Sequence, residues 1–294
     1  MYQIAIPVDA TSSSKPREEV TPEQLTSKHA VTSFSPLTND KVLLTISSLT
    51  SPNALSILDL SSSTNERLTP LASLTPDLRK EFGLDAGSEF TFTGAQGKEV
   101  HGWVILPPVY DKTQKYPLAF LVHGGPQGAW NDAWSTRWNP NVFAAAGYIT
   151  VAINPTGSTG YGQDFCDAIK NNWGGRPFQD LVAGLEYVKK SFPIDEKRMA
   201  ALGASYGGYM MNWIQVRSIL ESVSSLLTET LQGHNDVTKF AALVCHDGGA
   251  SRLDSAVLAI IADKVAFQYS RLRPHSLLPT SSTSPSESLE GYRG

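Results

Sequence analysis

The sequence predicts an α/β protein whose sheet is mostly parallel, preceded by a smaller region of antiparallel strands. Residues 116–122 and 149–154 are continuous apolar runs, which is the pattern of strands buried on both faces of a parallel sheet. Residues 177–192, between two such strands, carry apolar side chains near helical spacing. Strands that alternate with helices in this order form parallel α/β sheets.

Three regions differ in texture along the 294 residues. Residues 1–74 are rich in Ser and Thr and contain short β-like runs, so they predict either antiparallel strands or a disordered extension. Residues 75–250 hold the alternating strands and helices. Residues 251–294 are expected to be an aberrant segment that could begin with one helix and ends in a disordered tail rich in Ser, Pro and Thr.

Local patterns place the individual elements. In the first region, strands are expected at 2–8, 41–49 and 54–62, separated by turn stretches such as 33–40. In the second region, the remaining elements are a hairpin over 89–107 turning at Gly94 to Gly97, a helix over 139–148 ended by Gly147, a helix over 162–173, a strand over 198–205, a helix over 209–227 and a strand over 239–248. The helix over 177–192 has Asp180 in its expected first turn and Lys189 and Lys190 in its last, which suits the helix dipole.

Composition excludes several classes of function. The net charge of −4 and the pI near 5.9 provide no basic footprint for nucleic acid. Cys166 and Cys245 are too few for a disulfide framework, and no apolar run approaches the ~18 residues of a membrane span. The first ten residues lack the pattern of a signal peptide. The sequence contains no metal-binding cluster, P-loop or dinucleotide fingerprint, so neither a metal nor a cofactor is expected.

The first chemical motif is a G-x-S-x-G over Gly203 to Gly207, between an apolar strand and a helix. In this context the motif predicts a nucleophile elbow, in which a sharp turn exposes the serine hydroxyl above the sheet. Ser205 is then the nucleophile, and the N–H of Tyr206 belongs to an oxyanion hole. The alternative is a tight glycine-rich turn in which Ser205 caps the following helix.

The second motif is "HGGPQ", His123 to Gln127, which closes a buried strand about eighty residues earlier. A loop of this kind supplies the other oxyanion donor in α/β-hydrolases, and Gly124 and Gly125 allow the backbone to approach the substrate closely. The alternative is a plain turn between strand and helix. His123 is not expected to be the base, because in α/β-hydrolases the base follows the nucleophile in sequence.

Four motifs in this order and spacing, "HGGP", "NPTGSTGYGQDF", "NNWGGRPFQDLVAGLEYV" and "GASYGGYM", resemble the prolyl oligopeptidase family of serine peptidases. The resemblance covers roughly residues 20–248 and is greatest to the fungal dipeptidyl-peptidases within the family. It implies a β-propeller ahead of an α/β-hydrolase domain, so residues 1–74 are expected to be a propeller remnant and 75–250 an incomplete peptidase domain. It also implies short peptide substrates, release of N-terminal dipeptides, and secretion of the relatives.

The resemblance also assigns individual residues. Ser205 matches the nucleophile, Tyr206 the residue whose N–H enters the oxyanion hole, and Gly124 and Gly125 the loop with the second donor. His123 stands where some members of the family have an oxyanion tyrosine. The loop over 156–162 matches a segment near the active site and is given no catalytic role.

The family's downstream acid and base are not recognisable after Ser205, although a triad needs both. The candidate residues are Asp236, Asp247, Asp254, Asp263, His234, His246 and His275. Each is expected to be an ordinary surface or strand-end residue. The triad Asp and His are therefore expected to be absent, and the chain itself to be weakly active or inactive.

Residues 216–232 interrupt the resemblance to the family, which resumes at Gly233. These 17 residues correspond to 51 nucleotides (3 × 17), begin with a Val codon (GT) and end with a Gln codon that can be CAG. A translated, retained intron fits this pattern. The competing interpretation is a genuine helical insertion, since its apolar residues have helical spacing. Transcript reads that run uniformly across codons 216–232 would exclude the intron.

Three functions remain open from the sequence. The first is a dipeptidyl serine peptidase acting through Ser205. The second is an esterase or lipase with the same catalytic parts. The third is a catalytically dead fragment that acts at most as a binding module.

Overall fold

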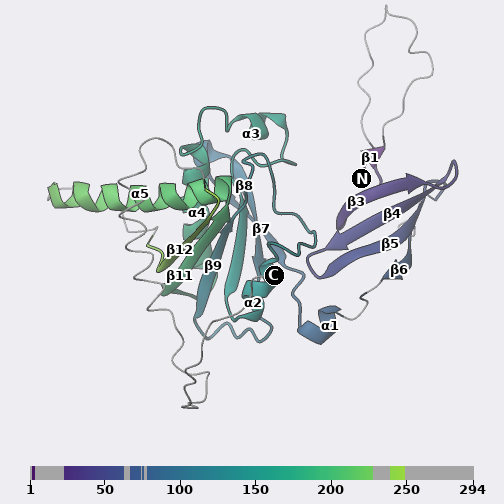
Figure 1. The fold of residues 1–294 in the computed structure, drawn as a ribbon, viewed down its shortest axis with the longest axis horizontal. Coiled ribbons are helices and arrows are strands. Elements are labelled where there is room, and N and C mark those ends of the chain that lie inside the picture. Colours follow the sequence, from purple (N-terminus) through teal and green to yellow (C-terminus); the bar gives the residue numbers. More distant parts are fainter. Residues whose placement is uncertain are drawn as a thin grey trace, which may run out of the picture.

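The computed structural model describes residues 2–3, 23–62, 67–73, 75, 78–227 and 239–248. These residues form a six-stranded sheet, a four-stranded sheet, and a short ribbon of β1 (Tyr2–Gln3) with β2 (Glu23–Gln24). Figure 1 shows the four-stranded sheet beside the six-stranded sheet, with helix α5 projecting on the opposite side. In the part of the chain that is described, no helix is both long and apolar enough to cross a membrane.

The six-stranded sheet is mixed and has the order β12-β11-β9-β10-β8-β7. Its parallel part contains β9 (Tyr116–Val122), β10 (Ile149–Asn154), β11 (Ile194–Ala204) and β12 (Ala242–His246). The expected hairpin is present as β7 (Ser88–Thr93) and β8 (Glu99–Ile105), which turn through the 3-10 segment Ala95–Gly97 and add two antiparallel pairings. The α/β prediction is confirmed.

Helices cover both faces of this sheet because its strands are apolar on both sides. On one face, α4 (Arg176–Ser191) and α5 (Tyr206–Leu227) pack on the larger apolar core. On the other face, α2 (Pro140–Ala145) packs through Ala144 against Leu121 and Ala152. The short helices α1 (Leu78–Phe82) and α3 (Gln163–Asp167) lie in connections. Because parallel strands end at one edge of a sheet, the turns after β9, β10 and β11 meet there.

The four-stranded sheet is an antiparallel meander of β3 (Ala30–Pro36), β4 (Lys41–Ser48), β5 (Ser51–Asp59) and β6 (Leu68–Ser73). Its core is small and centres on Val42, Leu44, Ile46 and Leu58. The strands expected at 41–49 and 54–62 are confirmed. The turn expected at 33–40 is wrong in its first half, because residues 33–36 pair with β4. Strand β6 was not expected.

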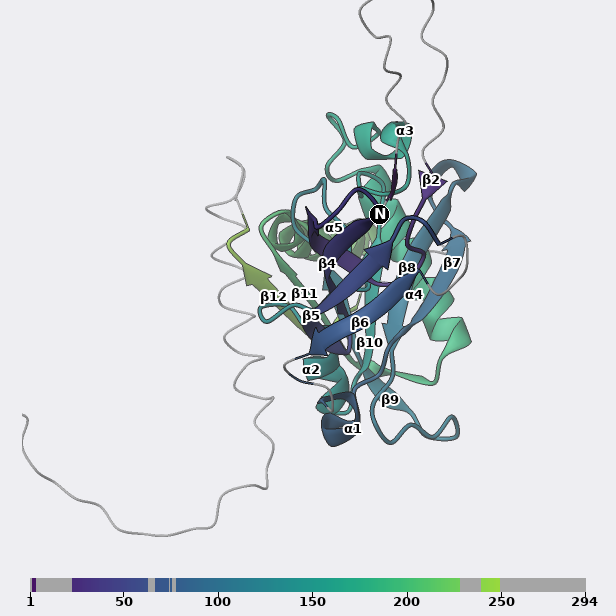
Figure 2. The ribbon, with the colours of Figure 1, turned by 90° about the vertical axis from the view of Figure 1, so that its right-hand side faces the viewer.

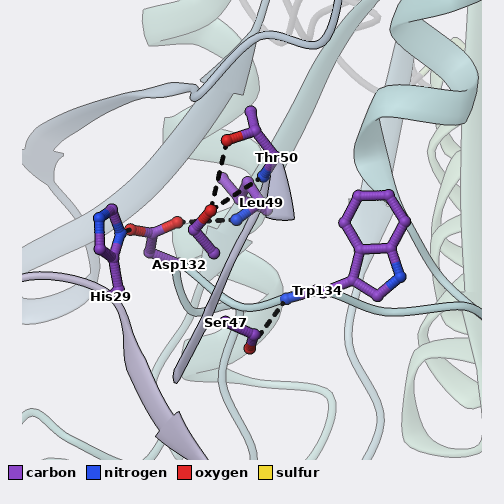
Figure 3. A network of polar contacts seen from close by, with 7 residues as sticks. His29, Ser47, Leu49, Thr50, Asp132 and Trp134 are labelled. Carbon is purple, nitrogen blue, oxygen red and sulfur yellow. Dashed lines mark hydrogen bonds and ion pairs between the residues drawn. The ribbon is translucent and has the colours of Figure 1, made fainter. Parts of the chain in front are cut away.

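The meander contacts the larger domain through the loop between β9 and α2 (Figure 3). The Asp132 carboxylate lies 2.7 Å from the Nδ1 atom of His29 and accepts a hydrogen bond of 2.8 Å from the N–H of Leu49. The N–H of Trp134 donates to the hydroxyl of Ser47. From α2, the side-chain amide of Asn141 donates to the carbonyl of Leu49. Figure 2 shows the meander in front of the larger sheet. These contacts fix the loop that continues from the "HGGP" motif.

Two expected helices need correction, and other predictions fall outside the described residues. The helix expected over 162–173 shortens to α3 (Gln163–Asp167) and continues as turns. Asp180 does not lie in the first turn of α4, which begins at Arg176; it lies farther along and is buried. Most of the strand expected at 2–8, and the helix and tail expected within 251–294, lie outside the described residues.

Helix α5 includes part of the segment that interrupts the family resemblance. Its backbone is helical through Leu227, as the insertion hypothesis expects, and the remaining residues up to 232 lie outside the described part of the chain. In Figure 1 the far end of α5 extends beyond the sheet. The intron hypothesis stays a prediction.

Candidate active site

Ser205 lies in a one-residue turn between β11 and α5. Its φ is +55°, in the left-handed region, which costs a non-glycine residue roughly 1–3 kcal/mol, and the residue is exposed. The turn is held on both sides: the N–H of Ser205 donates to the carbonyl of His246 at 2.9 Å, and its own carbonyl accepts from the N–H of Tyr209 at 2.9 Å. The surrounding sheet and helix thus fix a strained backbone that presents the hydroxyl to solvent.

The two glycines of the motif are needed because backbone passes against backbone at this turn. A Cβ atom on Gly203 would lie 2.4 Å from the carbonyl carbon of Gly207. A Cβ atom on Gly207 would lie 2.2 Å from the carbonyl oxygen of Val122, at the end of β9. No side chain larger than hydrogen fits at either position without moving the backbone.

The "HGGP" loop lies directly against Ser205. A Cβ atom on Gly124 would lie 3.3 Å from the Cβ atom of Ser205 and 3.0 Å from the carbonyl oxygen of Ala204. Gly125 has a φ of +131°, which favours glycine, and is exposed. The structure therefore brings together the serine and the glycine loop that the sequence predicted to act together.

The main chain of Tyr206 lies next to Ser205 in the turn, while its side chain is hydrogen bonded away from the turn. It is the first residue of α5, so its N–H has no partner within the helix and lies at the positive end of the helix dipole. The buried phenol donates to the carbonyl of Trp173 at 2.8 Å. Burial raises the pKa of this phenol far above its usual range. The main-chain N–H is thus the group that could stabilise an oxyanion.

His123 is buried, and both ring nitrogens face groups other than Ser205. Its Nδ1 atom lies 2.8 Å from the carbonyl oxygen of Gly124, and its Nε2 atom lies 2.9 Å from the hydroxyl of Ser158. Burial lowers the pKa of this imidazole, against the hydrogen bond to Gly124, which raises it. The ring thus contacts the glycine loop itself.

A buried carboxylate lies behind the loop that follows β10. Asp180 accepts hydrogen bonds from the N–H of Thr156 at 2.7 Å, from the hydroxyl of Thr156 at 2.5 Å and from the N–H of Ala95 at 2.6 Å. Burial raises the pKa of this carboxyl, and these hydrogen bonds oppose the rise. The sequence pattern predicts only that Asp180 interacts with the helix dipole. Its place on one stripe of α4 with Gly184 and Val188, both buried, was the signal that could have revealed it.

A second polar cluster was missed at the same edge of the sheet. The side-chain amide of Asn154, the last residue of β10, donates to the Tyr161 hydroxyl and to the Trp130 carbonyl and accepts from the Trp130 N–H. The Tyr161 hydroxyl lies 2.7 Å from the Nδ1 atom of His101. Burial raises the pKa of Tyr161 to about 12 and lowers the pKa of His101. The cluster ties the loop after β9 to β8 and β10.

The described residues provide no base for Ser205. Among them, no side chain is hydrogen bonded to its hydroxyl. His246 reaches Ser205 through its main-chain carbonyl and exposes its side chain, while Asp247 follows it with a φ of +52°. The other candidates for the acid and the base lie outside the described residues; they are Asp236, Asp254, Asp263, His234 and His275.

Comparison with known proteins identifies the family. Residues 134–219, which contain the loop after β10, the elbow and the first part of α5, match the model of the prolyl oligopeptidase family. This part of the chain belongs to the prolyl oligopeptidase family. The resemblance expected from the four motifs is thereby confirmed.

Relatives within the family are similar over most of the chain. Dipeptidyl-peptidase 5 of Schizosaccharomyces pombe is 43% identical over 234 residues, which are 79% of this chain and 30% of that protein. A probable dipeptidyl-peptidase 5 of Aspergillus clavatus is 42% identical over 240 residues, again 79% and 30%. The chain therefore spans about 30% of the length of these relatives.

Solved structures support the same fold. The uncomplexed acylaminoacyl peptidase of Pyrococcus horikoshii has a TM-score of 0.61 and 27% identity, covering 78% of this chain and 32% of its own. An acylaminoacyl peptidase bound to Z-Gly-Gly-Phe-chloromethyl ketone has the same TM-score at 26% identity, covering 79% and 33%. The mixed sheet with its helices is thus an α/β-hydrolase-like fold.

Proposed function

We propose that the protein is a serine peptidase that releases dipeptides from the N-termini of short peptides by acyl transfer through Ser205. The observation that supports this most is the exposed, strained Ser205 at the β11–α5 turn with the Gly124 backbone against it. Membership of the prolyl oligopeptidase family and the names of the fungal relatives support the peptidase class and the dipeptidyl specificity.

The proposed mechanism follows from the position of each group. The Ser205 oxygen attacks the scissile carbonyl carbon, and its proton passes to a base. The Tyr206 N–H and the Gly124–Gly125 backbone stabilise the tetrahedral oxyanion, each such donor being worth ~3 kcal/mol in the transition state. The C–N bond then breaks, the amine leaves with a proton from the base, and water hydrolyses the acyl-serine. No described residue is placed to act as this base or as its carboxylate, so we expect turnover by this chain to be slow.

Substitution of His246 tests whether this described residue acts as the base. Only its main-chain carbonyl contacts the elbow, so His246→Ala should change the reactivity of Ser205 by no more than about twofold. A general base typically contributes about 10²–10⁴-fold to the rate. Phosphonylation rates of the variant and the wild type with a fluorophosphonate therefore separate the two roles. A loss of a hundredfold or more would identify His246 as the base.

The domain organisation of the chain is also part of this proposal. The boundaries at 74/75 and 250/251 remain predictions, and the four-stranded meander of residues 30–73 is proposed to be one β-propeller blade. Its four antiparallel strands are what a blade requires. The family resemblance supports this assignment.

Substrate specificity can be tested with matched chromogenic substrates. We expect the chain to hydrolyse a dipeptidyl p-nitroanilide with a free amino group in preference to an N-acetylated aminoacyl p-nitroanilide and to a short acyl ester, measured as kcat/KM. Ser205→Ala provides the background for each substrate. Preference for the acetylated substrate would indicate an acylaminoacyl peptidase, and preference for the ester would indicate an esterase. Equal rates for wild type and Ser205→Ala would indicate a non-catalytic protein.

A further inference from the structure

We infer that Asp180 is a positioning residue for the oxyanion loop, residues 123–128. Asp180 fixes the β10 loop, residues 155–159, and the β10 loop in turn fixes the oxyanion loop. The inference rests on the proposed role of Ser205 and deepens it. Asp180 does not touch the site itself. It acts through Thr156, so its effect should appear in the geometry of the oxyanion donors and not in substrate affinity.

The first link is the anchoring of the β10 loop by α4. Asp180 is fully buried and holds Thr156 by two hydrogen bonds to one carboxylate oxygen, while its other oxygen holds the N–H of Ala95 in the β7–β8 turn. A Cβ atom on Gly94 would lie 2.3 Å from that second oxygen, so the hairpin backbone packs directly on the carboxylate. Charged hydrogen bonds of this type are stronger than neutral ones.

The second link joins the β10 loop to the oxyanion loop at two points. The Ser158 hydroxyl lies 2.9 Å from the Nε2 atom of His123 and donates to the Pro155 carbonyl. The N–H of Thr159 donates to the carbonyl of Gly128 at 3.0 Å. Ser158 is buried and lies two residues after Thr156, so we expect it to move with Thr156. We therefore expect a displacement of Thr156 to displace both ends of the oxyanion loop.

The two links lead to a specific kinetic expectation. The oxyanion donors act on charge that develops in the transition state, so displacing them lowers kcat more than it changes KM. A displacement of about 1 Å in a catalytic group can cost about a hundredfold in rate. A carboxylate with only a structural role would instead lower the folded fraction and affect every measurement in proportion.

Four variants of the 294-residue chain separate these possibilities. Thr156→Val removes only the hydroxyl bond to Asp180 and keeps the side-chain shape, whereas Thr156→Ser keeps the hydroxyl. Asp180→Ala removes all three hydrogen bonds that the carboxylate accepts. Glu186→Gln is the matched control, because it removes a carboxylate charge from the same helix at a site that faces Lys189 and Lys190.

The first readout is amide hydrogen exchange, which needs no activity. The informative amides are those of Thr159 and Gly128, which donate to Gly128 and Pro126 respectively. We expect both to exchange about tenfold faster in Thr156→Val and in Asp180→Ala, since a lost hydrogen bond of ordinary strength corresponds to about that factor. Thr156→Ser and Glu186→Gln should match the wild type. Unchanged exchange at Gly128 in both disrupted variants would overturn the inference.

The second readout is steady-state turnover of the dipeptidyl anilide. We expect kcat to fall about tenfold in Thr156→Val and up to about a hundredfold in Asp180→Ala, with KM within about twofold of the wild type and with Thr156→Ser restoring kcat. A raised KM with unchanged kcat would contradict the inference. A wild-type chain without turnover would count against the proposed function alone, because the exchange measurement still decides the role of Asp180.

Discussion

Ser205→Ala should reduce hydrolysis of a dipeptidyl anilide to the rate without protein, and the size of the loss is set by the wild-type rate, which we expect to be low because the described residues provide no base. The hydroxyl is the proposed attacking group, and the Cβ atom of Ser205 would lie 3.3 Å from a Cβ atom on Gly124. Steady-state rates of purified wild type and variant provide the measurement. Retention of more than a few per cent of the rate by Ser205→Ala would remove Ser205 from the mechanism.

A second substitution at this position tests the strain that accompanies this role. Ser205→Gly should be as inactive as Ser205→Ala but more stable, by about 1 kcal/mol in the free energy of unfolding, because only glycine adopts a φ of +55° without cost. Urea denaturation of the two inactive variants measures this difference directly. If Ser205→Gly is no more stable than Ser205→Ala, the elbow is not strained as described.

Gly207→Ala should have the largest effect on stability, more than about 4 kcal/mol, which is a large part of the stability of an ordinary domain. The added methyl would lie 2.2 Å from the carbonyl oxygen of Val122, and no flexible side chain could move to relieve the contact. We expect either a strongly lowered denaturation midpoint or insoluble protein.

A matched glycine separates this steric effect from the general cost of replacing glycine. Gly97 has a φ of +71°, and a methyl group added there would meet no atom within 4 Å. Gly97→Ala should therefore cost only about 1–2 kcal/mol, from the left-handed backbone alone. Comparable losses of stability in the two variants would show that the close approach at Gly207 does not determine the cost.

The elements that the sequence predicted well are those with local signals. Continuous apolar runs identified β9 and β10, because the residues of a strand that is buried on both faces are apolar. The G-x-S-x-G motif between strand and helix located the turn at Ser205, because its glycines meet the local requirements of that turn. The meander was harder to place. Alternating Ser, Thr and apolar residues mark strands weakly, so residues 33–36 were assigned to a turn and β6 was missed.

The long-range polar contacts of the side chains could not be predicted because their partners are distant in sequence. Asp180 meets Ala95 across 85 positions and Thr156 across 24. His101 meets Tyr161 across 60. From the sequence alone, a single carboxylate in a helix is expected to interact with the helix dipole or with solvent. Only the folded structure shows that the β7–β8 hairpin and the β10 loop pack on Asp180. The same holds for His123, whose place in the motif shows neither its burial nor its contact with Ser158.

The central claim, that Ser205 is the nucleophile, is tested most directly by mapping the adduct of a fluorophosphonate on the 294-residue chain by mass spectrometry. We expect one adduct per chain, on Ser205, formed slowly because the described residues provide no base, and absent from Ser205→Ala. An adduct on another serine, or no adduct on Ser205 after prolonged incubation of folded protein, would contradict the claim.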